Sequence, residues 1–183
     1  MLLEDGAGPG LIAGNGQTWR CICDSVMGGV STASLEREVL DGVSALCLRG
    51  DVSLQNNGGF VQMSLDLAPP RAVLDASEYS GLSLLVRGNS ERYNIHLRSH
   101  DMTRVWQSWR AEFRAPGEWT HLYIPFSSFH PHRTDLPVNP ARLSRVGLVA
   151  IGREMRADLA LARLEFATAS QAALASLRGA TEA

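Results

Sequence analysis

Lysine is absent from this sequence, and all 17 of its basic residues are arginine. Schiff-base chemistry and a phosphate-binding P-loop both need a lysine amine, so the sequence excludes both. An excess of charge of one sign is also lacking, because 17 basic and 19 acidic residues leave a formal net charge of −2. Nucleic-acid binding relies on a clustered basic face, and the net charge gives no sign of one. We therefore expect no nucleic-acid partner.

Cysteine is scarce, with three occurrences at Cys21, Cys23 and Cys47. An odd number of cysteines without a C-x-x-C pair argues against a disulfide framework and against a zinc cage. Cys21 and Cys23 would share one face of a strand, where a free cysteine behaves as a small buried hydrophobic residue. Unpaired thiols suit a reducing compartment, so we expect a cytoplasmic location.

Long hydrophobic runs are missing as well. No apolar stretch approaches the roughly 18–20 residues that span a bilayer. Residues 1–5 contain neither the basic region nor the apolar region of a signal peptide. The sequence therefore predicts a soluble protein with no membrane span and no secretion signal.

The length of 183 residues and a hydrophobic content of 45% fit one folded domain. Glycine is frequent between residues 5 and 16, and we expect residues 1–18 to be a flexible, glycine-rich lead-in. The single domain is predicted to cover residues 19–167. The alanine-rich tail over residues 168–183 is expected either to form one short helix or to fray.

From Trp19 onward, the dominant period of the hydrophobic pattern is two, which is typical of half-buried strands. Two of these runs flank Asp41-Gly42, a strong hairpin signal. The segments predicted as strands are 35–40, 43–48, 61–67, 82–86, 93–97, 103–114, 119–124, 146–151 and 159–166. Clusters of Gly, Pro, Asn and Ser separate them. The pattern predicts an all-β jelly-roll sandwich of two antiparallel sheets.

Two glycine-rich segments interrupt this pattern. Residues 24–31 read D-S-V-M-G-G-V-S, and residues 56–60 read N-N-G-G-F. Glycine pairs allow a positive φ, and Asp24 is placed to cap nearby amides. The side chains of Asn56 and Asn57 either contact a ligand or satisfy backbone groups of the turn.

Together with later segments, these motifs resemble the complex I intermediate-associated protein 30 family. The further matches are L-L-V-R-G-N at 84–89, R-Y-N-I-H-L-R at 92–98, G-E-W at 117–119, Y-I-P-F-S-S-F at 123–129 and residues 146–152. The similarity spans about residues 19–167, in the family's order, and the chain looks like a bacterial-type member. The resemblance implies a galactose-binding-like jelly roll and carries over no catalytic residue. Mitochondrial members are assembly factors for respiratory complex I.

Catalytic chemistry has little support in the residues. His130 and His132, with Asp135 nearby, have the H-x-H spacing of metal-binding jelly rolls, but the segment is proline-rich and lacks a fitting glutamate and third histidine. A surface loop is the better interpretation. No G-x-S-x-G elbow occurs, and no pattern pairs two carboxylates. We predict no catalytic residues, no metal and no cofactor.

Aromatic and arginine residues supply the candidate binding groups. Trp106 and Trp109 are predicted to face opposite sides of one strand, one in the core and the other exposed for a sugar ring or a protein, or stacked under an arginine. Arg87 and Arg98 would face a carboxylate or phosphate from neighbouring polar strand faces, or pair within the chain. Trp19 and Trp119 are expected in the core. The predicted ligand- or partner-binding residues are Asp24, Asn56, Asn57, Arg87, Tyr93, Arg98, Trp106 and Arg110.

Three functional hypotheses follow. The first is a non-catalytic interaction module or assembly chaperone whose partner is another protein or a protein complex, including a membrane-associated one. The second is a carbohydrate-binding module with a sugar ligand, which the expected reducing compartment disfavours. The third and weakest is a metal-dependent jelly-roll enzyme.

Overall fold

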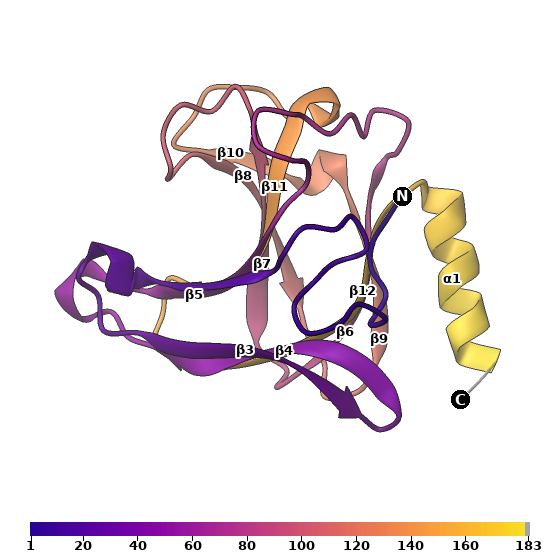
Figure 1. Ribbon diagram of the computed structural model, residues 1–183, viewed down its shortest axis with the longest axis horizontal. Helices are drawn as coiled ribbons and strands as arrows, with labels where there is room; N and C mark the ends of the chain where they lie inside the picture. The colour runs from indigo at the N-terminus through magenta and orange to yellow at the C-terminus, as the bar shows by residue number, and fades with distance from the viewer. Residues whose placement is uncertain (182–183) are drawn as a thin grey trace.

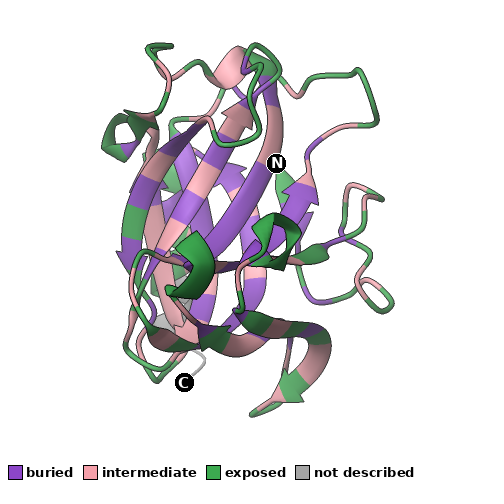
Figure 2. Ribbon diagram, turned by 90° about the vertical axis from the view of Figure 1, so that its left-hand side faces the viewer, coloured by how far each residue is buried: buried purple, intermediate pink, exposed green. Residues whose placement is uncertain are grey.

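The strands show the alternating burial that their sequences predict. In strand β7 (Arg92–Ser99), the side chains of Tyr93, Ile95 and Leu97 are completely buried, while the residues between them are partly exposed. Figure 2 shows the same alternation along the neighbouring strands. The computed structural model describes residues 1–181, and its strands form two antiparallel sheets packed face to face (Figure 1).

The first sheet, called sheet I, has the strand order β3-β4-β12-β6-β9, and β1 is added beside β12. Its strands are β1 (Leu2–Glu4), β3 (Thr32–Leu40), β4 (Val43–Val52), β6 (Gly81–Gly88), β9 (Thr120–Pro125) and β12 (Met155–Ala167). The hairpin between β3 and β4 turns at Asp41 and Gly42, which have φ angles of 51° and 81°. Two consecutive positive φ angles match a two-residue hairpin turn, so the predicted hairpin is confirmed.

The second sheet, called sheet II, has the order β10-β8-β7-β11-β5-β2. Its remaining strands are β2 (Arg20–Cys23), β5 (Phe60–Asp66), β8 (Ser108–Arg114), β10 (His130–His132) and β11 (Leu143–Ile151). The predicted all-β sandwich is therefore confirmed. Strand β10 replaces the surface loop expected at His130–His132, because these residues pair with β8 along its free edge.

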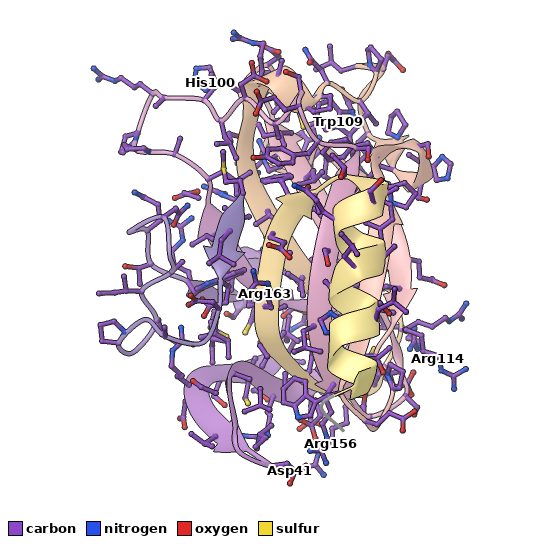
Figure 3. The ribbon with its side chains drawn as sticks, turned by 90° about the vertical axis from the view of Figure 1, so that its right-hand side faces the viewer. Asp41, His100, Trp109, Arg114, Arg156 and Arg163 are labelled. Carbon is purple, nitrogen blue, oxygen red and sulfur yellow. The ribbon has the colours of Figure 1, made fainter. Side chains whose placement is uncertain are left out.

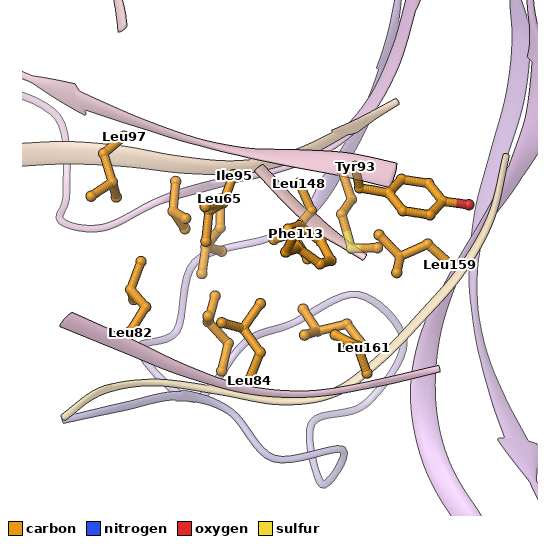
Figure 4. Close-up of a cluster of buried hydrophobic side chains, with 14 of the residues drawn as sticks. Leu65, Leu82, Leu84, Tyr93, Ile95, Leu97, Phe113, Leu148, Leu159 and Leu161 are labelled. Atoms are coloured by element: carbon orange, nitrogen blue, oxygen red, sulfur yellow. The ribbon is translucent and has the colours of Figure 1, made fainter. Parts of the chain in front are cut away.

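One hydrophobic core fills the space between the sheets. Figure 4 shows side chains of sheet I facing side chains of sheet II. The labelled leucines from sheet I are Leu82, Leu84, Leu159 and Leu161, and opposite them lie Leu65, Ile95, Leu97, Phe113 and Leu148. Trp19 and Trp109 are also in this core, each with 1% of its surface exposed. Trp119 was also expected in this core but lies outside it. Its side chain packs with Ala45, Cys47 and Ala160 on the outer side of sheet I.

The first residues of the chain are part of the sandwich. Leu3 is completely buried, and the buried carboxylate of Glu4 accepts hydrogen bonds from the indole nitrogen of Trp19 and from Arg37 Nη1, each at 2.9 Å. This corrects the expectation of a flexible lead-in for that stretch.

The tail does form a helix, α1 (Ala169–Thr181), which packs against β9 (Figure 3). Cys21 is exposed on the edge strand β2, contrary to the expected burial.

Tyr93 joins the two sheets. Its ring lies in the core, and its hydroxyl donates to Asn89 Oδ1 at 2.7 Å and accepts from the backbone nitrogen of Asp158, on β12, at 3.0 Å. Burial raises the pKa of the Tyr93 phenol to about 12. The expectation that Tyr93 contacts a ligand is wrong, because position 93 has the inward parity of its strand.

We expect Tyr93→Phe to lower the free energy of unfolding by about 1–2 kcal/mol, because the partly buried backbone amide of Asp158 loses its partner. Urea denaturation of both proteins measures the difference. Tyr123→Phe is the control, since the Tyr123 hydroxyl bonds Ser80 Oγ in an exposed position where water replaces it. Equal losses in the two variants would contradict the bridging role of Tyr93.

Candidate binding face

The outer face of sheet II carries a polar row that crosses all six strands. Residues directly paired in neighbouring strands point to the same side of a sheet. The row consists of His130, Arg110, His96, Gly147, Ser64 and Arg20. Because the alternate residues of the same strands fill the core, this row faces away from it. We call this side of sheet II the binding face.

Gly147 leaves a gap at the middle of the row. A Cβ atom at this position would stand 3.0 Å from Gln62 Oε1, so the amide of Gln62 lies close to the space that a side chain would take. On either side of the gap, Ser64 Oγ and His96 Nε2 are buried without a hydrogen-bond partner among the described residues. Two strand spacings separate their backbones, about 10 Å. Unmatched buried polar atoms are costly, so these two atoms have hydrogen-bonding capacity that the described residues leave unmet.

Arginine dominates the charge of this face. Its arginines are Arg20, Arg92, Arg98, Arg110, Arg114 and Arg145, against the carboxylates of Asp66 and Glu112. Asp66 pairs with both Arg20 and Arg145 at 2.8 Å, and Glu112 lies 3.4 Å from Arg92. Over the described part of the chain, Arg98 and Arg110 have no carboxylate partner.

Arg98 braces the loop between β7 and β8. Its Nη1 donates to the backbone oxygens of Val105 and Gln107, the residues on either side of Trp106. Burial, followed by the charge of Arg145, lowers the pKa of the Arg98 guanidinium. Arg98 was predicted to pair with a carboxylate or a ligand, and its observed contacts are with this loop.

Trp106 lies in that loop rather than on the strand, because β8 begins only at Ser108. Its side chain is 51% exposed, and the guanidinium carbon of Arg104 lies 5.9 Å from the ring centroid. An arginine therefore stacks on the exposed tryptophan, one of the two alternatives left open by the sequence. Trp109 is in the core, as expected for one of the pair, and its indole nitrogen donates to Leu136 O at 2.9 Å.

Arg110 lies on strand β8, next to His96 in the row. Its Nε donates to Ser108 Oγ at 3.1 Å, and none of its other nitrogens has a hydrogen-bond partner in the described residues. Burial, followed by the charge of Arg133, lowers the pKa of the Arg110 guanidinium. Burial and the charges of Arg110 and His132 lower the pKa of the neighbouring His96 to about 3. His96 is therefore neutral at pH 7, and Arg110 supplies the positive charge beside it in the row.

Asp24 has a structural role at one end of this face, where the 3-10 helix η1 (Asp24–Met27) follows β2. Its completely buried carboxylate accepts hydrogen bonds from Ser31 N at 3.0 Å, Ser31 Oγ at 2.5 Å, Gly59 N at 2.5 Å and Phe60 N at 3.2 Å. Asp24 thus caps amides, as the sequence suggested, and the prediction that it binds a ligand is wrong because no part of it reaches the surface.

The two glycine-rich motifs meet at Asp24. A Cβ atom at either Gly29 or Gly58 would overlap its carboxylate. We call residues 24–31 and 53–60, held together by this carboxylate, the Asp24 loop unit. The unit projects beyond sheet II at the left of Figure 1. Sequence reasoning missed its exposed apolar side chains, which are Val26, Met27, Val30 and Leu54.

Asn56 and Asn57 lie in the 3-10 helix η2 (Gln55–Asn57) of this unit. Both are exposed, with φ angles of 56° and 58°. Asparagine tolerates this left-handed backbone better than most residues, which accounts for both positions structurally. They lie near the start of β5, whereas Arg98 and Trp106 lie at the opposite end of the face, so the structure does not bring them together.

Arg87 lies on the other side of the sandwich. It pairs with Asp41 at the tip of the hairpin, and its Nε donates to Gly117 O at 2.9 Å. It lines a cleft of about 400 Å³ with Arg49 and Asp158, which also form an ion pair. The prediction that Arg87 and Arg98 belong to one concave sheet is therefore wrong, because β6 and β7 are in different sheets.

The described residues contain no group of three or more His, Cys, Asp or Glu side chains placed to hold a metal ion. None of the described helices is long and apolar enough to cross a membrane.

Residues 13–162 match the model of the Complex I intermediate-associated protein 30 (CIA30) family. The chain belongs to this family. Among curated protein sequences there is no significant match. Both glycine-rich motifs that meet at Asp24 lie within the matched residues.

Solved structures similar to this CIA30 family member include carbohydrate-binding modules of Clostridium thermocellum. The family 11 module of the cellulosomal cellulase Lic26A-Cel5E has a TM-score of 0.69 and 15% identity, covering 92% of this chain and 94% of the module. The family 11 module in complex with a β-1,3-1,4-mixed-linked tetrasaccharide has a TM-score of 0.66 and 14% identity, with 92% and 95% covered. The family 30 module of Cel9D-Cel44B has a TM-score of 0.63 and 13% identity, with 92% and 98% covered. At these identities, the likeness shows the jelly-roll fold.

We expect Asp24→Asn to lower the free energy of unfolding by about 2–4 kcal/mol, because an amide cannot accept from all four donors. Chemical denaturation at neutral pH measures the loss. Asp75→Asn is the matched control, because Asp75 also accepts from a backbone amide and a hydroxyl, both of Ser77, but is exposed. A similar loss in both variants would contradict the importance of burial.

The stability difference between wild type and Asp24→Asn should also depend on pH. Burial raises the pKa of the Asp24 carboxyl, but hydrogen bonds from Ser31, Gly59 and Phe60 outweigh it and hold the pKa below its ordinary value of 3.8. A carboxyl whose pKa is lower in the folded state stabilises the fold at pH values above its ordinary pKa. This stabilisation is lost as the pH falls toward the pKa of the folded state. The stability gap between wild type and Asp24→Asn should therefore narrow below about pH 4. A gap that widens on acidification would refute this account.

Proposed function

We propose that this protein is a non-catalytic interaction module that takes part in assembling respiratory complex I or a related protein complex. Its family supports this role, since the matched model is named for association with complex I intermediates. Its three free cysteines are compatible with action in the cytoplasm. The partner is a protein or a protein complex, including a membrane-associated one.

The binding face is the surface that supports the proposal most directly. Its Arg98 and Arg110 have no acidic partner among the described residues, and two buried polar atoms on the same face, Ser64 Oγ and His96 Nε2, have no hydrogen-bond partner there. Exposed Trp106 stands at one end of the face and the apolar side chains of the Asp24 loop unit at the other. Tryptophan and arginine dominate the energetics of many protein interfaces. On sheet I, by contrast, the charged groups of the cleft beside Arg87 pair with one another.

Affinity purification of the tagged protein from its native cells, followed by mass spectrometry, tests this proposal. We expect a recurrent protein partner with the wild type, and at least tenfold less of it with Trp106→Ala, because an interface tryptophan typically contributes about 2 kcal/mol or more. Leu174→Ala is the control, since Leu174 is similarly exposed but lies on α1, away from the binding face. Failure to recover any partner under several conditions would overturn the proposal.

A carbohydrate-binding role is the second candidate. It is supported by the solved family 11 module that holds a β-1,3-1,4-mixed-linked tetrasaccharide, and by the exposed Trp106 and Gln62 amide on the binding face. Sugar rings stack on aromatic side chains, and amides bond their hydroxyls.

Isothermal titration with β-1,3-1,4-mixed-linked oligosaccharides tests this candidate. A sugar-binding module should release heat on titration, and Trp106→Ala should weaken the binding about tenfold. If the protein gave no signal above background on an array of neutral glycans, the carbohydrate-binding role would be refuted.

A further inference from the structure

The charge of Arg110, on strand β8 of the binding face, is uncompensated. Its register neighbours on β7 and β10 are His96 and His130, neither of which is a carboxylate. The carboxylates of this face pair with other arginines. Asp66 pairs with Arg20 and Arg145, and Glu112 pairs with Arg92. Burial partly strips Arg110 of water without replacing it by a counter-charge, which is costly unless an anion binds.

Ser64 lies farther along the row. It is 1% exposed, and its Oγ lacks a partner in the described residues. Three strand spacings, about 14 Å, separate its backbone from that of Arg110. Ser108 is also buried on this face and already bonds Arg110 Nε, which orients the guanidinium. The terminal nitrogens of Arg110 therefore remain available as a planar fork, the arrangement that recognises a carboxylate through two hydrogen bonds.

We infer that the binding face recognises an acidic segment of a partner protein, with a Glu or Asp carboxylate bound by Arg110. This rests on the proposed interaction function and specifies the chemistry of the partner. The segment lies across the row from His130 to Ser64, and its apolar flanks contact Trp106 at one end and Met27 of the Asp24 loop unit at the other.

The shape of the face favours a protein segment over an extended anionic surface. The loop of Trp106 and the Asp24 loop unit both project beyond sheet II (Figure 1), while Arg110 is half-buried on strand β8. A flat anionic membrane would touch the projecting loops before it reached Arg110. An extended chain advances about 3.3 Å per residue, so a short acidic segment fits between the loops.

Fluorescence anisotropy with a labelled peptide of repeating Glu-Ala pairs tests the inference. Arg110→Gln removes the charge and keeps a hydrogen-bonding side chain, and we expect it to weaken binding about tenfold or more. Arg156→Gln is the matched control, because Arg156 is exposed on β12 of sheet I and its substitution changes the net charge equally. We expect its affinity to stay within about twofold of wild type. Thermal unfolding of each variant verifies that it is folded.

Two results would overturn the inference. One is an equal effect of Arg110→Gln and Arg156→Gln, which would indicate attraction by net charge alone. The other is wild-type binding to phosphatidylserine vesicles or to single-stranded RNA, lost in Arg110→Gln, without binding to the acidic peptide. A matching peptide of repeating Gln-Ala pairs should not bind, and equal binding of both peptides would also contradict recognition of a carboxylate.

Native purification separates this inference from the proposed function. If wild type recovers a partner and Arg110→Gln recovers the same amount, the partner is real but Arg110 does not recognise it, so only the inference fails. If wild type recovers no partner, the proposed function itself fails. Loss of the partner with Arg110→Gln but not with Arg156→Gln supports both.

Discussion

The buried carboxylate of Asp24 is the constraint on which the loops around the binding face depend. It has no cationic partner among the described residues and is held by the hydroxyl and backbone of Ser31 and by two amides of the 53–60 loop. Removing a charge from water is tolerated only when such donors replace the solvent. Because the carboxylate occupies the space where side chains at Gly29 and Gly58 would begin, both positions must be glycine. One buried group therefore explains two sequence motifs about thirty residues apart, and it fixes where the exposed Met27 is presented.

The sequence was sufficient for what depends on local periodicity. Alternation along β7 identifies Tyr93, Ile95 and Leu97 as one face, and Asp41-Gly42 marks the hairpin, because both features are decided within a few residues. The assignment of strands to sheets depends on pairing between distant segments. Consecutive strands β6 and β7 lie in different sheets, which places Arg87 and Arg98 on opposite sides of the sandwich. Strand β10 was missed for the same reason, since its pairing with β8 gives order to a proline-containing segment with no strand pattern of its own.

The candidate site shows a second limit of sequence reasoning. The net charge of −2 is a sum over the whole chain, and it conceals a face where six arginines meet two carboxylates. Alternation placed Arg98 and Arg110 on polar faces, but only the register between strands shows that Arg110 lies beside His96 and in line with Gly147 and Ser64. Likewise, periodicity correctly gave Trp109 to the core and exposed Trp106. It did not show that Arg98 holds the Trp106 loop through the backbone oxygens around it.

The fold itself does not choose between a protein partner and a sugar. A jelly roll related in architecture to carbohydrate-binding modules offers an outer sheet face to either ligand, and at 13–15% identity the architecture says nothing about which is bound. The charge of the face does discriminate. The hydroxyls of a neutral glucan can bond the amide of Gln62 and stack on Trp106, but they bring no counter-charge to Arg110. A carboxylate brings both the charge and two acceptors in the plane of the guanidinium. The partly dehydrated, unpaired Arg110 therefore makes an acidic protein segment the better match for this face.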